Sequence, residues 1–207
     1  GCGPLKEAIA DYEHTKKEYL ICGNGAADLI FSLSRALNPK KALLPAPTFA
    51  EYEQALVSVG CEISRYYLKE ENDFCIQGDY PDILKREKPD IIFLCNPNNP
   101  TGITVPQNLL EEILETCAMQ GIFMVVDECF LDFVKDPEKH TLKEKLEKYP
   151  GLFILKAFTK RYAIPGVRLG YGFCSDREVL DRMEAVTQPW NVSTMAQQAG
   201  MAALKEA

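Results

Sequence analysis

The residues best suited to chemistry stand just beyond short apolar runs. Lys160 follows the run 152–155 after a short bend, and Asp127 follows the run 122–126 directly. A lysine beyond a buried strand can act as an amine nucleophile, and a carboxylate that ends one needs a partner to offset its lost hydration. Taken singly, each also fits a plainer role, a surface lysine for Lys160 and a helix cap for Asp127, so their meaning depends on the neighbouring loops.

Two loops and an arginine complete the set of candidate residues. Residues 23–28 (GNGAAD) precede a predicted helix, so their backbone N–H groups and the helix N-terminus would suit a phosphate. The same residues would also form an ordinary tight turn. Residues 96–102 (NPNNPTG) contain two Asn-Pro steps, which predict a rigid loop that fixes an Asn side chain. Arg168 comes eight residues after Lys160.

The apolar pattern predicts alternating strands and helices that would position these residues. The predicted strands are 20–22, 42–44, 91–95, 122–126, 152–155 and 167–173. The predicted helices are 4–12, 26–37, 49–59, 106–120, 139–148 and 176–185, with a further helical stretch over 195–207. Continuous apolar strands are typical of a sheet covered on both faces. We therefore predict an α/β fold, a three-layer α/β/α sandwich with a mostly parallel central sheet, which binds ligands where its strands end.

Composition narrows the class of protein. The 207 residues are 46% hydrophobic, enough for one large core, and carry a net charge of −7. Lys and Arg are dispersed among Asp and Glu, so we expect no nucleic-acid partner. No apolar run is long enough to cross a bilayer, so we expect no membrane partner. The eight cysteines form no C-x-x-C pair and fit small core residues, which favours a reducing, cytoplasmic compartment.

The ordered set of loops, acid, lysine and arginine resembles the type I fold enzymes that depend on pyridoxal 5'-phosphate (PLP), the superfamily of aspartate aminotransferase and the class I/II aminotransferases. The N-P-T-G element at 99–102, the pair Asp127–Glu128 and the T-K…R-L-G run from 159 carry this resemblance. The sequence is similar to one branch of this superfamily in four stretches, residues 47–52, 127–133, 159–166 and 188–192. That branch holds histidinol-phosphate aminotransferases and the L-threonine-O-3-phosphate decarboxylases of cobalamin synthesis.

The resemblance implies a role for each residue near the cofactor ring. Lys160 would hold PLP covalently and then move protons, while Asp127 would pair with the pyridine nitrogen. Asn99 would donate to the phenolate oxygen. Phe49 would stack on the ring, with Tyr52 as the alternative. Many relatives have a Tyr at the place of Phe130, so a hydroxyl contact to the phenolate oxygen would be missing here.

A second group of residues would hold the cofactor phosphate. By the resemblance, Gly25, Ala26 and Ala27 bind it from one side, the last two through their backbone amides. Thr159 and Arg168 would reach it from the other, since a guanidinium offers forked donors and a permanent charge. No metal ligand set is expected, and both catalytic roles fall to Lys160 and Asp127.

The resemblance also implies parts that lie outside this chain. We expect residues 1–207 to be a fragment of the PLP-binding large domain, without an N-terminal segment and a C-terminal small domain. The full-length protein would be a homodimer acting on a small phosphorylated amino acid or amino alcohol. A threonine-phosphate decarboxylase that gives aminopropanol phosphate is the preferred function, and an aminotransferase that uses 2-oxoglutarate is the alternative. A PLP-binding effector domain of a transcription regulator is a remote third.

Overall fold

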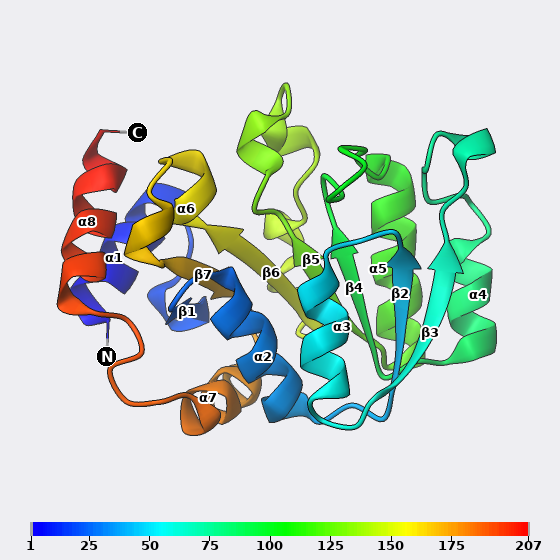
Figure 1. Ribbon diagram of the computed structural model, residues 1–207, viewed down its shortest axis with the longest axis horizontal. Helices are drawn as coiled ribbons and strands as arrows, with labels where there is room; N and C mark the ends of the chain where they lie inside the picture. Colours follow the sequence, from blue (N-terminus) through cyan, green and yellow to red (C-terminus); the bar gives the residue numbers. More distant parts are fainter. Residues whose placement is uncertain (1, 207) are drawn as a thin grey trace.

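Seven strands form one sheet in the computed structural model, which describes residues 2–206 (Figure 1). The strands are β1 (Leu20–Gly23), β2 (Lys41–Ala46), β3 (Glu62–Tyr67), β4 (Ile91–Cys95), β5 (Phe123–Asp127), β6 (Leu152–Ala157) and β7 (Gly170–Phe173). The helices are α1 (Gly3–Glu13), α2 (Ala26–Leu37), α3 (Ala50–Val57), α4 (Tyr80–Glu87), α5 (Gln107–Gln120), α6 (Phe158–Arg161), α7 (Arg177–Val186) and α8 (Thr194–Lys205).

The order of the strands is β1-β7-β6-β5-β4-β2-β3. Neighbouring strands are parallel, except that β7 runs antiparallel to both β6 and β1. The prediction of a mostly parallel sheet is therefore confirmed. Because β4, β5 and β6 are parallel neighbours, the residues that follow them all lie beyond the carboxyl ends of the strands, on one side of the sheet.

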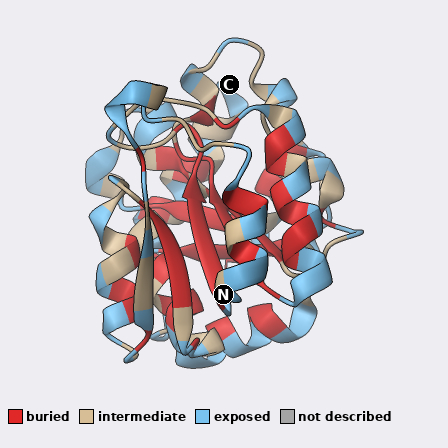
Figure 2. Ribbon diagram, turned by 90° about the vertical axis from the view of Figure 1, so that its right-hand side faces the viewer, coloured by how far each residue is buried: buried red, intermediate tan, exposed pale blue. Residues whose placement is uncertain are grey.

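Two apolar cores lie on opposite faces of the sheet. Ile92 and Leu94 of β4 join the core packed by α1, α4, α5 and α8, whereas Ile91 and Phe93 join the core packed by α2, α3 and α7. Side chains alternate between the faces of a strand, so a strand covered on both sides must be apolar throughout. Figure 2 shows the result, with buried strands at the centre and helices exposed only on their outer faces.

Several parts of the secondary structure differ from the prediction. Strand β3 was not predicted because it lies at the edge of the sheet and its side chains are half-buried or exposed. The short helices α4 and α6 were also missed, and α6 was expected only as a bend. The predicted helix over 139–148 is wrong, since this segment contains only short 3-10 turns. Its Thr141 hydroxyl and the Leu142 backbone N–H donate instead to Glu128, which holds the segment in an irregular path.

The predicted strand 167–173 begins too early, since β7 starts at Gly170 after the 3-10 turn Pro165–Val167. The other boundaries agree within two residues. Helix α2 begins and ends as predicted, and α5 begins one residue later than predicted, after Pro106. Within residues 2–206, no helix has the length and apolar character needed to span a membrane.

Candidate functional site

Asp127 and Lys160 lie beyond neighbouring strands at the same edge of the sheet. Asp127 is the last residue of β5, paired in register with Cys95 of β4 on one side and Leu155 of β6 on the other. Lys160 lies in α6, which begins immediately after β6. The sheet therefore brings the predicted acid and the predicted amine to one side of the molecule, as the strand-end argument requires.

Neutral donors, rather than a cation, satisfy the Asp127 carboxylate. The residue is 4% exposed. Tyr52 donates its hydroxyl to Oδ2 at 2.6 Å, and the backbone N–H of Cys129 donates to Oδ1 at 2.9 Å. Burial and then the nearby Asp127 raise the pKa of Tyr52 well above its usual value, so Tyr52 stays a donor. The carboxylate is thus fixed in orientation while its charge remains available to a ligand.

The structure separates the two aromatic candidates for ring stacking. Tyr52 is fully buried, stacks on Phe93 with centroids 4.9 Å apart, and is committed to Asp127. Phe49 is half-buried and meets Tyr52 edge-on at 5.5 Å. Phe49 is therefore the better placed of the two for a ligand. The function of Tyr52 in orienting Asp127 was not predicted, because nothing in the sequence signals a contact between residues so far apart.

Lys160 lies close to the ring of Phe130. Its Nζ is 5.1 Å from the ring centroid, a cation–π contact, and the residue is exposed. Lys160 is therefore open to solvent, although it follows a buried strand. Phe130 stands three residues after Asp127, so the aromatic ring that contacts Lys160 comes from the loop that follows β5.

A candidate anion cradle lies where β1 leads into α2. Gly25 has a φ of 87°, and an added Cβ there would lie 2.8 Å from Nη2 of Arg168. An added Cβ at Gly170 would lie 2.6 Å from the backbone nitrogen of Ala26. Both positions therefore require glycine. The close approach places a guanidinium beside the N-terminus of α2, where the first N–H groups are free to bind an anion.

Thr159 and Arg168 stand just beyond the last contact between β6 and β7. Ala157 pairs with Gly170, and the backbone N–H of Phe158 donates to the carbonyl of Leu169 at 3.2 Å. Thr159 is then the second residue of α6, and Arg168 follows the 3-10 turn Pro165–Val167. Of the two predicted residues, Arg168 contacts the cradle at Gly25.

The asparagine-rich loop is held by its own side chains. Asn96 is buried, accepts from Val105 N–H at 2.9 Å and donates to the His140 carbonyl at 3.1 Å. Asn98 accepts from the Thr48 hydroxyl and donates to the Pro47 carbonyl. Both are committed to the structure of the loop, which leaves the half-buried Asn99 as the side chain suited to reach a ligand.

Glu128, the neighbour of Asp127, faces the opposite side of the sheet. It is 1% exposed and accepts from the hydroxyl of Thr141 at 2.8 Å. Nearby, Glu13 forms ion pairs with Lys143 at 2.9 Å and Lys156 at 3.2 Å. Burial raises the pKa of Glu128 to about 7, which Lys156 and Thr141 only partly offset. Of the two adjacent acids, Asp127 therefore faces the candidate site, whereas Glu128 lies in the core on the other face of the sheet.

Glu128 should make stability depend on pH. Its folded pKa of about 7 exceeds the ordinary 4.5, so the folded state binds its proton more tightly. This contribution is complete below the unfolded pKa and is lost as pH rises through the folded value, a loss of about 3 kcal/mol. As the pH rises from below 4.5 to above about 7, we expect the unfolding free energy of the native protein to fall by that amount relative to a Glu128→Gln variant. Urea titrations of both proteins below and above this pH range would measure the difference. A difference that does not change with pH would contradict the expectation.

The fold and the strand-end residues define an α/β protein with a candidate anion cradle at one point and a buried carboxylate at another. The cradle lies beside β7 and Asp127 ends β5, two strand spacings away, or about 10 Å. Such a separation fits PLP, because the N–H groups and the guanidinium suit its phosphate and a carboxylate suits its ring nitrogen. The chain belongs to the aminotransferase class I and II family, whose sequence profile matches residues 2–207.

Two curated relatives illustrate the range of the family. Threonine-phosphate decarboxylase of Salmonella typhimurium is 37% identical over 204 residues, covering 98% of this chain and 55% of the relative. Histidinol-phosphate aminotransferase of Brevibacillus brevis is 31% identical over 204 residues, again covering 98% and 55%. This chain thus spans about half the length of the curated relatives it matches.

A solved structure shares the fold over nearly the whole chain. The histidinol-phosphate aminotransferase from Clostridium acetobutylicum superposes with a TM-score of 0.89 at 31% identity, covering 99% of this chain and 60% of that protein. The resemblance to a PLP-dependent family and to this branch of it, stated from the motifs, is therefore confirmed.

Proposed function

We propose that this chain is the cofactor-binding part of a PLP-dependent decarboxylase that acts on L-threonine-O-3-phosphate and releases aminopropanol phosphate. The observation that supports this most directly is the 37% identity to a threonine-phosphate decarboxylase over 98% of the chain, together with an intact set of strand-end residues. The expectation of a substrate that is a phosphorylated amino compound rests on the same relative.

The cradle would bind the cofactor phosphate. The amides of Ala26 and Ala27 at the start of α2 supply neutral donors, while the Gly25 N–H donates to the Gly23 carbonyl at 2.8 Å and shapes the turn. Arg168 supplies charge from across Gly25. Thr159 adds a hydroxyl from α6. Because Gly25 and Gly170 keep these groups in contact, we propose that the cradle is formed before the cofactor arrives.

Asp127 would hold a proton on the ring nitrogen. PLP, when bound, supplies an electron sink for the pair released when a bond at the substrate Cα breaks. A carboxylate fixed by Tyr52 and by the Cys129 N–H cannot turn away from that nitrogen. Asn99 would donate to the ring oxygen and Phe49 would cover one ring face.

Lys160 would perform the covalent attachment and the proton transfer. Its Nζ lies over Phe130 at the strand edge, within the same region as Asp127. In a decarboxylation, the freed amine would deliver to Cα the proton that takes the place of the lost carboxylate. Phe130 carries no hydroxyl, so Asn99 would be the donor left for the ring oxygen on this side.

Two assays on the protein expressed from its complete open reading frame and saturated with PLP test the proposal. The first supplies threonine phosphate and measures carbon dioxide and aminopropanol phosphate, which are expected. The second supplies histidinol phosphate with 2-oxoglutarate and measures glutamate, which is not expected.

The second assay tests the alternative function. A histidinol-phosphate aminotransferase is favoured by the TM-score of 0.89 to the Clostridium acetobutylicum enzyme. Glutamate without carbon dioxide would overturn the decarboxylase in favour of that alternative. A PLP-loaded protein that yields neither product would overturn both.

A further inference from the structure

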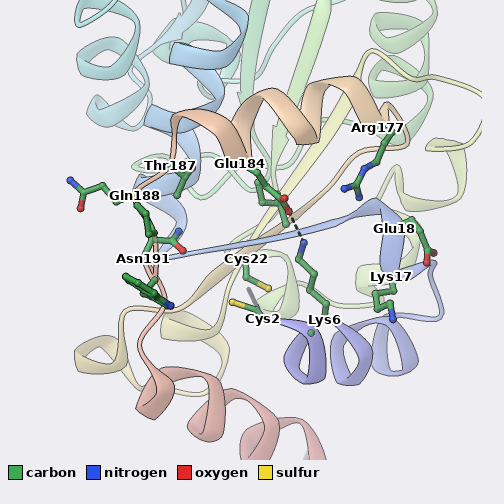
Figure 3. A pocket seen from close by; sticks show the side chains of 14 residues that line it. Cys2, Lys6, Lys17, Glu18, Cys22, Arg177, Glu184, Thr187, Gln188 and Asn191 are labelled. Carbon is green, nitrogen blue, oxygen red and sulfur yellow. Dashed lines mark hydrogen bonds and ion pairs between the residues drawn. The ribbon is translucent and has the colours of Figure 1, made fainter.

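Two cysteines from separate elements meet at a cavity on the opposite side of β1 from β7. Cys2 directly precedes α1, and Cys22 lies in β1. Both line a cavity of about 620 Å³, together with Lys6 and Glu184. Figure 3 shows the two sulfur atoms facing each other, with the Lys6–Glu184 ion pair of 3.0 Å above them.

The two thiols are in contact and differ in acidity. A hydrogen bond with Cys22 lowers the pKa of Cys2 to about 7, against the effect of burial and with help from the Lys6 ammonium. The same hydrogen bond and burial raise the pKa of Cys22 well above its usual value. By contrast, burial raises the pKa of Cys95, Cys117 and Cys174 to about 12 each. Cys2 is thus the more acidic thiol of the pair, with the second thiol beside it.

The position of the pair permits a small oxidant to reach it. Cys2 is 9% exposed and Cys22 6%, and the exposed part of each faces the cavity. Both also belong to one apolar cluster with Leu5 and Leu20, so α1 packs firmly on β1 at this point. Two thiols already in contact need little backbone movement to join.

We propose that Cys2 and Cys22 are a redox-active dithiol that a peroxide converts to a reversible disulfide. The Cys2 thiolate attacks one oxygen of hydrogen peroxide and the O–O bond breaks. The departing hydroxide takes up a proton to become water and leaves Cys2 as a sulfenic acid. Cys22 gives up its proton and attacks that sulfur, the S–S bond forms, and the sulfenic oxygen leaves as a second water. The two cysteines lose two electrons, which reduce the peroxide to two waters.

The cross-link would act next to the phosphate cradle. Cys22 is followed by Gly23 and then by Asn24, whose N–H donates to Asp28 at 2.9 Å, and this turn leads to Gly25. A disulfide would attach the start of α1 to the strand that carries the cradle. It would close a chain loop and so raise the midpoint of thermal unfolding.

Peptide mapping tests this directly. The protein expressed from its complete reading frame is treated with hydrogen peroxide, its remaining thiols are alkylated, and its peptides are analysed by mass spectrometry. We expect a linked peptide pair carrying Cys2 and Cys22, lighter by two hydrogen atoms and separated by dithiothreitol. Peroxide-treated protein with other cysteines oxidised but no such link would overturn the proposal.

Matched variants identify the role of each thiol. In Cys22→Ser we expect Cys2 to accumulate as a sulfenic acid that dimedone traps, whereas Cys117→Ser should leave the link unchanged. Alkylation of Cys2 in the native protein, followed against pH, should show half-maximal rate near neutral pH. A rate that still rises steeply at the ordinary thiol pKa would also overturn the proposal, and this measurement needs no variant.

Discussion

A Lys160→Ala variant is expected to lose covalent attachment of the cofactor and nearly all turnover. Two functions disappear together, because the same amine would bind PLP and transfer the proton at Cα. Loss of a positioned acid–base group alone costs roughly 10²- to 10⁴-fold in rate. The fold should persist, since Lys160 is exposed and the lost cation–π contact with Phe130 contributes about 1 kcal/mol or less.

Absorbance and steady-state rates check this expectation. The band that PLP gives near the visible edge when joined to a lysine should be present in the native protein and absent from Lys160→Ala. Lys85→Ala is the matched control, because Lys85 is an exposed helix residue whose ion pair with Asp82 lies at the surface. A variant at 160 that kept the band would show that another amine holds the cofactor.

The sequence predicted the edge of the sheet at which these groups meet, for a simple physical reason. Continuous apolar runs such as residues 91–95 and 122–126 require cover on both faces, and parallel neighbours then end at one side. Asp127 and Lys160 were found as candidates because they are the chemically useful residues that follow two of these runs. The small residues at 23–28 before a predicted helix suggested the cradle, and the family resemblance added the role of Arg168.

Contacts between distant residues could not be read in this way. The hydrogen bond from Tyr52 to Asp127, the opposite facing of Glu128 and the meeting of Cys2 with Cys22 depend on tertiary packing. Strand β3 was missed because an edge strand need not be apolar. The segment 139–148 was mistaken for a helix because its lysines and glutamates favour one locally, while the bonds to Glu128 prevail in the fold.

An Asp127→Asn variant is expected to bind PLP but to turn over on the order of 100- to 1000-fold more slowly. The amide keeps the size of the side chain and an oxygen for the N–H of Cys129, so the fold should survive. What it loses is the negative charge that would keep the ring nitrogen protonated. An electrostatic contact that acts on charge developing in the reaction is worth about this much in rate.

A Tyr52→Phe variant distinguishes the effect of the Asp127 charge from the effect of its fixed orientation. This variant leaves the carboxylate charged but removes the 2.6 Å hydrogen bond that fixes Oδ2. We expect it to lower turnover less than Asp127→Asn does, and to leave the cofactor band in place. Turnover rates and absorbance spectra of both variants, measured alongside the native protein, test this order of effects. If Asp127→Asn kept native turnover, the carboxylate would have no part in the chemistry, and the ring would have to sit elsewhere along the sheet edge.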